Sequence, residues 1–126
     1  HPYFRETRKM TAALVVFAGG GAGSLVRYLL GVLFRSTTTS LPLATFAANI
    51  CACIIFALFI YIERGRPLSS NIHLLVLTGF CGGLSTFSTF GYETWLLLAA
   101  QQWSFAALNM VVSMAASLAL FYLATR

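Results

Sequence analysis

Four long apolar segments dominate the sequence and limit what it can fold into. They span residues 11–34, 43–62, 72–100 and 104–125. Each has about the 20 residues that a helix needs to cross the hydrocarbon core of a bilayer. The connections between them are short, so no stretch remains for a separate soluble domain. The sequence therefore predicts an all-α membrane protein, residues 1–126, with four transmembrane helices in a single integral membrane domain.

Composition and charge agree with this class of protein. Hydrophobic residues make up 59% of the 126 residues, charged residues only 9%, and the mean hydropathy is +0.83. Soluble domains usually carry about 25% charged residues. The net charge of +5 could suggest a nucleic-acid partner, but the basic residues lie at the ends of the apolar segments. Because basic residues typically flank membrane spans, we expect a lipid bilayer as partner and no nucleic acid.

Cysteine and histidine residues give no sign of catalysis or of a transition-metal site. The three cysteines, Cys51, Cys53 and Cys81, lie in apolar segments without a C-x-x-C pair, so we interpret them as small buried hydrophobic residues. His1 lies in the terminal tail and His73 at the start of a helix. The chain is not expected to be an enzyme.

The N-terminal residues 1–9 form a polar, basic head, after which Met10 is a plausible native start. No signal-peptide cleavage pattern follows the head. Positive charge favours one side of the membrane, because one side would carry Arg5, Arg8, Lys9, Arg64, Arg66 and Arg126, and the other Arg35. Without the head the imbalance falls to three against one, so we expect a shortened chain to insert in both orientations.

The least apolar part of the third segment reads T-G-F-C-G-G-L-S-T-F-S-T-F-G-Y-E, from Thr78 to Glu93. Three closely spaced glycines, Gly79, Gly82 and Gly83, weaken a helix. We therefore predict that the third helix is broken near residues 79–85. Backbone groups freed by a break cannot stay unpaired in hydrocarbon, so protein, water or an ion must satisfy them. The stretch thus predicts an ion site.

Polar residues in the other segments each allow two interpretations. Arg27 can extend toward the membrane surface or face a cavity. Asn49, one turn after Thr45, can join helices or line an ion path. Asn109, Ser113 and Ser117 follow one another at four-residue spacing, which suits either close packing of small residues or a polar stripe. In the first segment, Gly19 and Gly23 have the spacing that lets two helices approach closely.

A small anion leaving water needs hydrogen-bond donors, because an uncompensated charge in a low dielectric is very costly. Candidate donors are Arg27, the amide of Asn49 and the hydroxyls of Ser88, Thr89, Ser113 and Ser117. Phe87 and Phe90 lie on one helix face, and the edge of an aromatic ring is electropositive. On the residues alone, plain packing explains the two phenylalanines better than an anion path.

The glycine cluster followed by S-T-F-S-T-F and, three residues later, Glu93 resembles the third helix of the Fluc (CrcB) fluoride channels, and the resemblance extends from about Met10 to the end of the chain. It implies an antiparallel homodimer with two pores at the subunit interface. It also implies a central structural Na⁺ held by the backbone carbonyls of Gly82 and Ser85.

The resemblance gives roles to the polar residues as well. It implies that Asn49 is a pore residue with Thr45 as its partner, that Phe87 and Phe90 line the path, that Ser113 and Ser117 face it, and that Arg27 draws anions inward. The chain departs from the family pattern at Ala47, at Asn109 and at Gly91-Tyr92 before Glu93.

The implied function is passive export of fluoride across a bacterial inner (cytoplasmic) membrane, which lowers cytoplasmic fluoride. Two alternatives compete with it. A proton-coupled small multidrug exporter also has four helices, but it depends on a carboxylate in the first helix, and segment 11–34 has none. A structural membrane subunit would use the glycines and serines only for packing.

Overall fold

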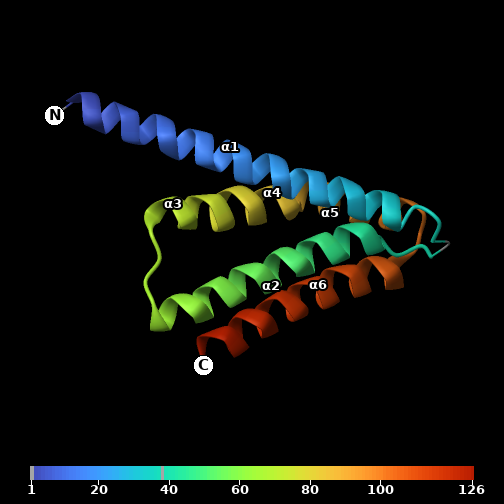
Figure 1. The fold of residues 1–126 in the computed structure, drawn as a ribbon. Coiled ribbons are helices and arrows are strands. Elements are labelled where there is room, and N and C mark those ends of the chain that lie inside the picture. The colour runs from blue at the N-terminus through green and yellow to red at the C-terminus, as the bar shows by residue number, and fades with distance from the viewer. Residues whose placement is uncertain (1, 38) are drawn as a thin grey trace.

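The computed structural model describes residues 2–37 and 39–126, and its regular secondary structure is helical throughout these ranges. The helices are α1 (Pro2–Leu33), α2 (Leu43–Gly65), α3 (Ser70–His73), the π-helix η1 (Leu74–Cys81), α4 (Gly82–Leu84), α5 (Phe87–Ala99) and α6 (Trp103–Thr125) (Figure 1). Four spans are long and apolar enough to cross a membrane: Pro2–Leu33, Leu43–Gly65, Ser70–Ala99 and Trp103–Ala124. The prediction of an all-helical chain with four membrane-length helices is confirmed.

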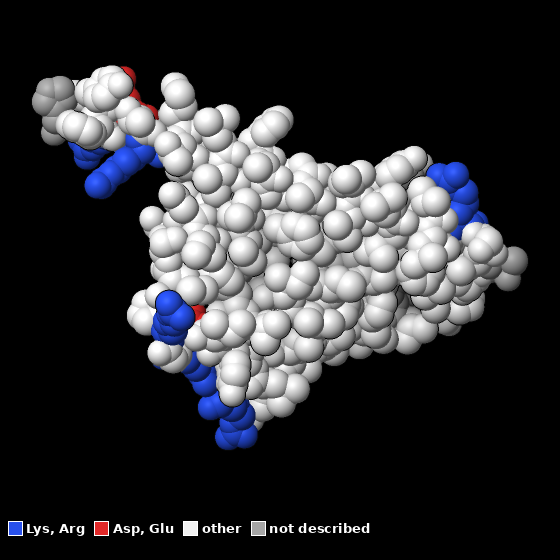
Figure 2. Space-filling view, in the orientation of Figure 1, with Lys and Arg blue, Asp and Glu red and all other residues white. Residues whose placement is uncertain are grey.

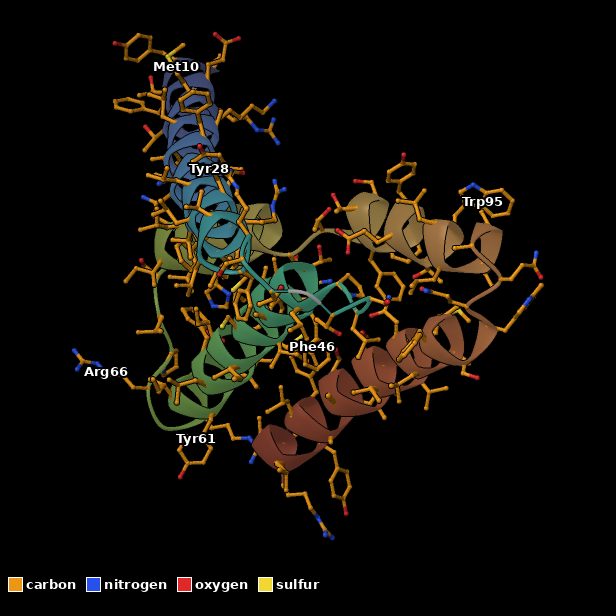
Figure 3. All side chains as sticks on the ribbon, turned by 90° about the vertical axis from the view of Figure 1, so that its right-hand side faces the viewer. Met10, Tyr28, Phe46, Tyr61, Arg66 and Trp95 are labelled. Atoms are coloured by element: carbon orange, nitrogen blue, oxygen red, sulfur yellow. The ribbon has the colours of Figure 1, made fainter. Side chains whose placement is uncertain are left out.

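The helices pair along their lengths. α1 packs against η1 and α4, and α2 packs against α6 (Figure 1). α5 diverges from α1, and its Trp95 points away from the other helices (Figure 3). The chain then reverses at Gln101, whose φ of 61° permits a tight turn into α6. A small buried cluster at the centre joins α2 to the broken third span and consists of Ala48, Ala52, Cys81 and Leu84.

Glycines allow α1 to touch the third span backbone to backbone. A Cβ added at Gly19 would meet the carbonyl oxygen of Leu75, and one added at Gly23 would meet that of Phe80. A Cβ at Gly83 would likewise meet the Gly20 carbonyl oxygen. The predicted close approach at Gly19 and Gly23 is therefore confirmed, and its partner is the glycine cluster of the third span.

The third span is broken as predicted, but the break lies at the end of the predicted range 79–85 and not within its glycine cluster. Gly79 lies within η1, and Gly82 and Gly83 lie within α4, so the backbone stays helical through the glycine cluster. It becomes extended only at Ser85 (φ −78°, ψ 152°) and Thr86 (φ −147°, ψ 119°). The glycines are needed for contact with α1, whereas Thr86 caps the next helix by accepting a hydrogen bond from the Thr89 amide at 3.3 Å.

Helix ends and cysteine positions also differ in part from the predictions. α1 begins at Pro2, so the polar head is helical from there, and α2 continues to Gly65 rather than ending at residue 62. Cys81 is buried and Cys53 half-buried, but Cys51 is exposed. The interpretation of all three cysteines as buried residues is therefore wrong for Cys51, which lies on the outer face of α2.

Candidate ion site at the helix break

The break in the third span is held by Asn49 of α2. The Asn49 Nδ2 donates to the Thr86 carbonyl oxygen at 3.3 Å, and the Thr86 amide donates to the Asn49 Oδ1 at 2.7 Å. A side-chain amide has an acceptor oxygen and two N–H donors, so it can pair with a backbone amide and carbonyl at once. Asn49 thus replaces helical hydrogen bonds that Thr86 loses, and one of its N–H groups remains for another acceptor.

A second freed carbonyl is held by α1. In a continuous helix, the Gly83 carbonyl would accept from the amide of residue 87. Here it accepts from the Arg27 Nε at 3.1 Å and from the Ser24 Oγ at 3.5 Å. Arg27 therefore contacts the broken helix through its Nε. The other N–H groups of its guanidinium take no part in this hydrogen bond.

Two further carbonyls near the break lose their helical donors. The Thr86 amide would pair with the Gly82 carbonyl in a continuous helix, but it donates to Asn49 instead. The Thr89 amide would pair with the Ser85 carbonyl, but it donates to the Thr86 Oγ1. The Ser85 amide and Oγ both donate to the Cys81 carbonyl, at 3.0 and 2.8 Å, and this ties Ser85 to the end of η1.

A groove of about 250 Å³ runs alongside the break. Five of the predicted site residues line it together with Ser85, namely Asn49, Phe87, Phe90, Ser113 and Ser117. They come from three separate spans, α2, α5 and α6. Thr86, Cys53, Met110 and Met114 complete the lining, which includes no acidic or basic side chain.

The serines of α6 differ in their hydrogen bonds. The Ser117 Oγ donates to the Ser113 carbonyl at 2.8 Å and accepts from the Cys53 Sγ at 3.5 Å. The Ser113 Oγ is buried and has no hydrogen-bond partner among the described residues. Since a buried hydroxyl without a partner is costly, its position on the groove indicates a ligand or water that accepts from it.

The two phenylalanines stand one turn apart at the start of α5. Their ring centroids are 6.2 Å apart and the rings are inclined by 36°. Phe87 is 85% exposed in the single chain, whereas Phe90 is half-buried. Phe87 therefore does not pack in the core of the single chain, and its ring is open to lipid, to a second chain or to the groove.

The other predicted site residues lie outside the groove. Ser88 is exposed, with its Oγ 3.4 Å from the Thr86 Oγ1, and Thr89 supplies the amide that Thr86 caps. Thr45 is buried, and its Oγ1 donates to the Glu93 Oε1 at 2.7 Å. Thr45 and Glu93 line a different hollow of about 430 Å³ beside the loop after α1.

Sequence reasoning missed three parts of this arrangement. It did not identify Thr86 as the residue at the break, although a threonine before a helix is a common N-cap. It left Glu93 without a partner, although a half-buried carboxylate within a membrane span needs a nearby donor such as Thr45. It did not pair Asn109, which is buried and donates through Nδ2 to the Thr94 Oγ1 at 3.0 Å.

Known proteins resemble the chain over most of its length. Residues 14–125 match the family described as "CrcB-like protein, Camphor Resistance (CrcB)". A protein from Phocaeicola vulgatus named "Fluoride-specific ion channel FluC" is 42% identical over 90 residues, which cover 71% of this chain and 74% of the relative. Proteins of the same name from Escherichia coli O139:H28 and Escherichia fergusonii are 40% and 39% identical over 112 residues, 88% of each chain.

Proposed function

Because the chain belongs to the CrcB-like family, whose members are ion channels and not enzymes, we propose that it conducts fluoride passively out of the cytoplasm. The relatives' names support fluoride as the transported ion. The relatives are bacterial proteins named as ion channels, and the four membrane-length spans of this chain support a multi-pass protein, which we place in the bacterial inner membrane.

The observation that carries this proposal is the unpaired hydroxyl of Ser113 in the groove. Fluoride is small and strongly hydrated, so it enters a protein only where donors replace its water. The Ser113 hydroxyl and the second N–H of Asn49 are two such donors on one groove. The neutral lining suits conduction, because binding must be strong enough for entry and weak enough for exit.

Phe87 and Phe90 would guide the ion along the other wall of the groove. The positive edge of an aromatic ring attracts an anion weakly and without a fixed charge. Thr45 would stabilise the neighbouring hollow through its hydrogen bond to Glu93. Ser88 and Thr89 would present hydroxyls at the start of α5. Ser117 would extend the polar wall of the groove by one helical turn from Ser113. Arg27 would add positive potential near the break through its free N–H groups.

We further propose that Na⁺ binds the carbonyls of Gly82 and Ser85. Both carbonyls have lost their helical donors, and carbonyl oxygen is a hard ligand suited to this cation, so the residues fit the ion. Gly82 is exposed at the surface of the chain, which suits a site shared with a second copy. A bound Na⁺ would supply positive charge and hold the break open between two chains.

An antiparallel homodimer would cover the exposed face of α5. Phe87, Tyr92 and Trp95 are each more than 60% exposed in the single chain, and Gly82, in α4 just before the break, is exposed as well. Two copies packed at this face would each complete the other's groove, giving two pores per dimer.

Reconstitution into liposomes tests the proposal. Liposomes that contain the purified protein should release loaded fluoride without an energy source and should retain chloride. Phe87→Ile should slow the fluoride release markedly. Phe17→Ile is a matched control, because Phe17 is 80% exposed on α1, away from the groove. No fluoride release above protein-free liposomes would favour a purely structural subunit, and release that requires a proton gradient would favour an exporter.

A further inference from the structure

The first helix is too long for the membrane that it would cross. α1 has 32 residues, so at 1.5 Å per residue it measures about 48 Å, against about 30 Å for the hydrocarbon core. Its apolar sequence begins near Met10. We therefore place the first turns of α1 beyond the core, at the level of the headgroups; they project from the rest of the molecule at the upper left of Figure 2.

Most of the positive charge gathers at this end of the molecule. Six of the eight lysine and arginine residues lie here, on the first turns of α1, at the end of α2 and at the C-terminus: Arg5, Arg8, Lys9, Arg64, Arg66 and Arg126 (Figures 1 and 2). Tyr61 and Tyr122 lie at the same end and are 63% and 55% exposed. Exposed tyrosines with basic neighbours are typical of the level of lipid headgroups.

A cleft of about 570 Å³ separates the α1 extension from α3. One helical face of α1 lines it, with Phe4, Thr7, Arg8, Thr11 and Ala12. These residues are three or four positions apart, which places them on the same side of the helix. The opposite wall consists of Ser70, Asn71 and Leu74 from α3 and the start of η1. The cleft is thus polar near its charged residue and apolar at Ala12 and Leu74.

Arg8 is the charged residue of this cleft, and no carboxylate lies within ion-pair distance of it among residues 2–37 and 39–126. Of the carboxylates at this end, Glu63 pairs with His73, and Glu6 lines a neighbouring hollow with Arg8 but does not line the cleft. Arg8 and Asn71, on opposite walls of the cleft, both carry N–H donors for the oxygens of a phosphodiester, which arginine binds in a bidentate manner.

We propose that the cleft between the α1 extension and α3 binds the headgroup of an anionic phospholipid, with Arg8 and Asn71 on the phosphodiester and the acyl chains along Ala12 and Leu74. The positive charge of Arg8 in the cleft selects an anionic lipid. The position of the cleft at the level of the headgroups favours a membrane lipid over soluble phosphate. Clusters of basic residues next to a membrane span commonly recruit such lipids. This site is separate from the groove at the helix break.

Native mass spectrometry of the full chain in detergent tests the site. In detergent the orientation in which the chain inserts into a membrane has no influence on the result. Phosphatidylglycerol should be retained in preference to phosphatidylcholine. Arg8→Gln should lower retention of phosphatidylglycerol about fivefold or more, since it removes a bidentate, charge-assisted hydrogen bond to the phosphodiester. Asn71→Ala should also lower it, although this variant leaves the charge unchanged.

Arg5→Gln is the matched control, because it removes the same charge from the same helix outside the cleft. It should reduce retention much less than Arg8→Gln. Equal losses of phosphatidylglycerol retention in the two variants would show a general attraction by positive charge and would contradict a specific site. Equal retention of the two lipids by the unaltered chain, or displacement of the lipid by inorganic phosphate at millimolar concentration, would overturn it as well.

Discussion

Asn49 holds Thr86 by both of its backbone polar groups, with its Nδ2 on the carbonyl at 3.3 Å and its Oδ1 on the amide at 2.7 Å. The two residues are 37 positions apart in the chain. Their contact fixes the only extended backbone between η1 and α5 and places Phe87 next to the groove. The helix break is therefore stabilised by α2 and is not a property of the third span alone.

Replacing Asn49 by Leu should weaken the fold and abolish conduction together. The change leaves the Thr86 amide and carbonyl without partners, and each buried unsatisfied group costs about 1–3 kcal/mol. Thermal unfolding in detergent and fluoride release from liposomes measure the two effects. Asn49→Asp keeps the acceptor for the Thr86 amide, so it should lose less stability, while its negative charge should still block fluoride.

Ser113→Ala should separate conduction from stability. The buried Ser113 hydroxyl has no partner among the described residues, so its removal should leave stability unchanged or raise it. Fluoride release should fall about tenfold or more, because a hydrogen bond to an ion contributes about 1.5–3 kcal/mol. Normal release by a stably folded Ser113→Ala protein would remove this hydroxyl from the ion path.

Gly23→Ala should disrupt the contact between α1 and the third span. The new methyl group would meet the Phe80 carbonyl oxygen, and such overpacking costs about 1–3 kcal/mol. Gly21→Ala is the matched control, since nothing lies within 4 Å of the added methyl group. Melting temperatures of the two variants should differ clearly, and equal values would contradict the close contact.

Glu93→Gln distinguishes a channel from a proton-coupled exporter. Glutamine keeps an oxygen that accepts from the Thr45 hydroxyl, so the local structure should persist. A passive channel should then release fluoride with or without a proton gradient. Complete loss of transport in this variant, together with gradient-dependent transport in the unaltered chain, would instead assign Glu93 to proton coupling.

Deletion of residues 1–9 should allow insertion in both orientations, because it removes Arg5, Arg8 and Lys9 from one end. A single cysteine at Ser36, an exposed position in the loop after α1, reports the orientation once the three native cysteines are replaced by serine. Impermeant thiol reagents added to either side of the membrane should each label part of the shortened protein. Labelling from one side only would show that the remaining charges still fix the topology.

Hydropathy and residue spacing determined much of this protein by themselves. The four apolar segments predict the four membrane-length helices, because a span must satisfy its own backbone hydrogen bonds within hydrocarbon. Polar residues within apolar segments make Asn49, Ser113 and Ser117 candidates, and the resemblance to the fluoride channels adds Phe87 and Phe90; all five line one groove. Polar side chains in apolar segments are conspicuous for the same energetic reason.

Tertiary structure alone decided where the third helix breaks and what each polar group binds. Helix propensity places the weak point at Gly82 and Gly83, but their backbone stays helical because α1 packs directly against it. The extended residues are Ser85 and Thr86, where a side chain from α2 replaces the lost helical bonds. Such partners lie far apart in the sequence, and local residue preferences carry no record of contacts between distant segments.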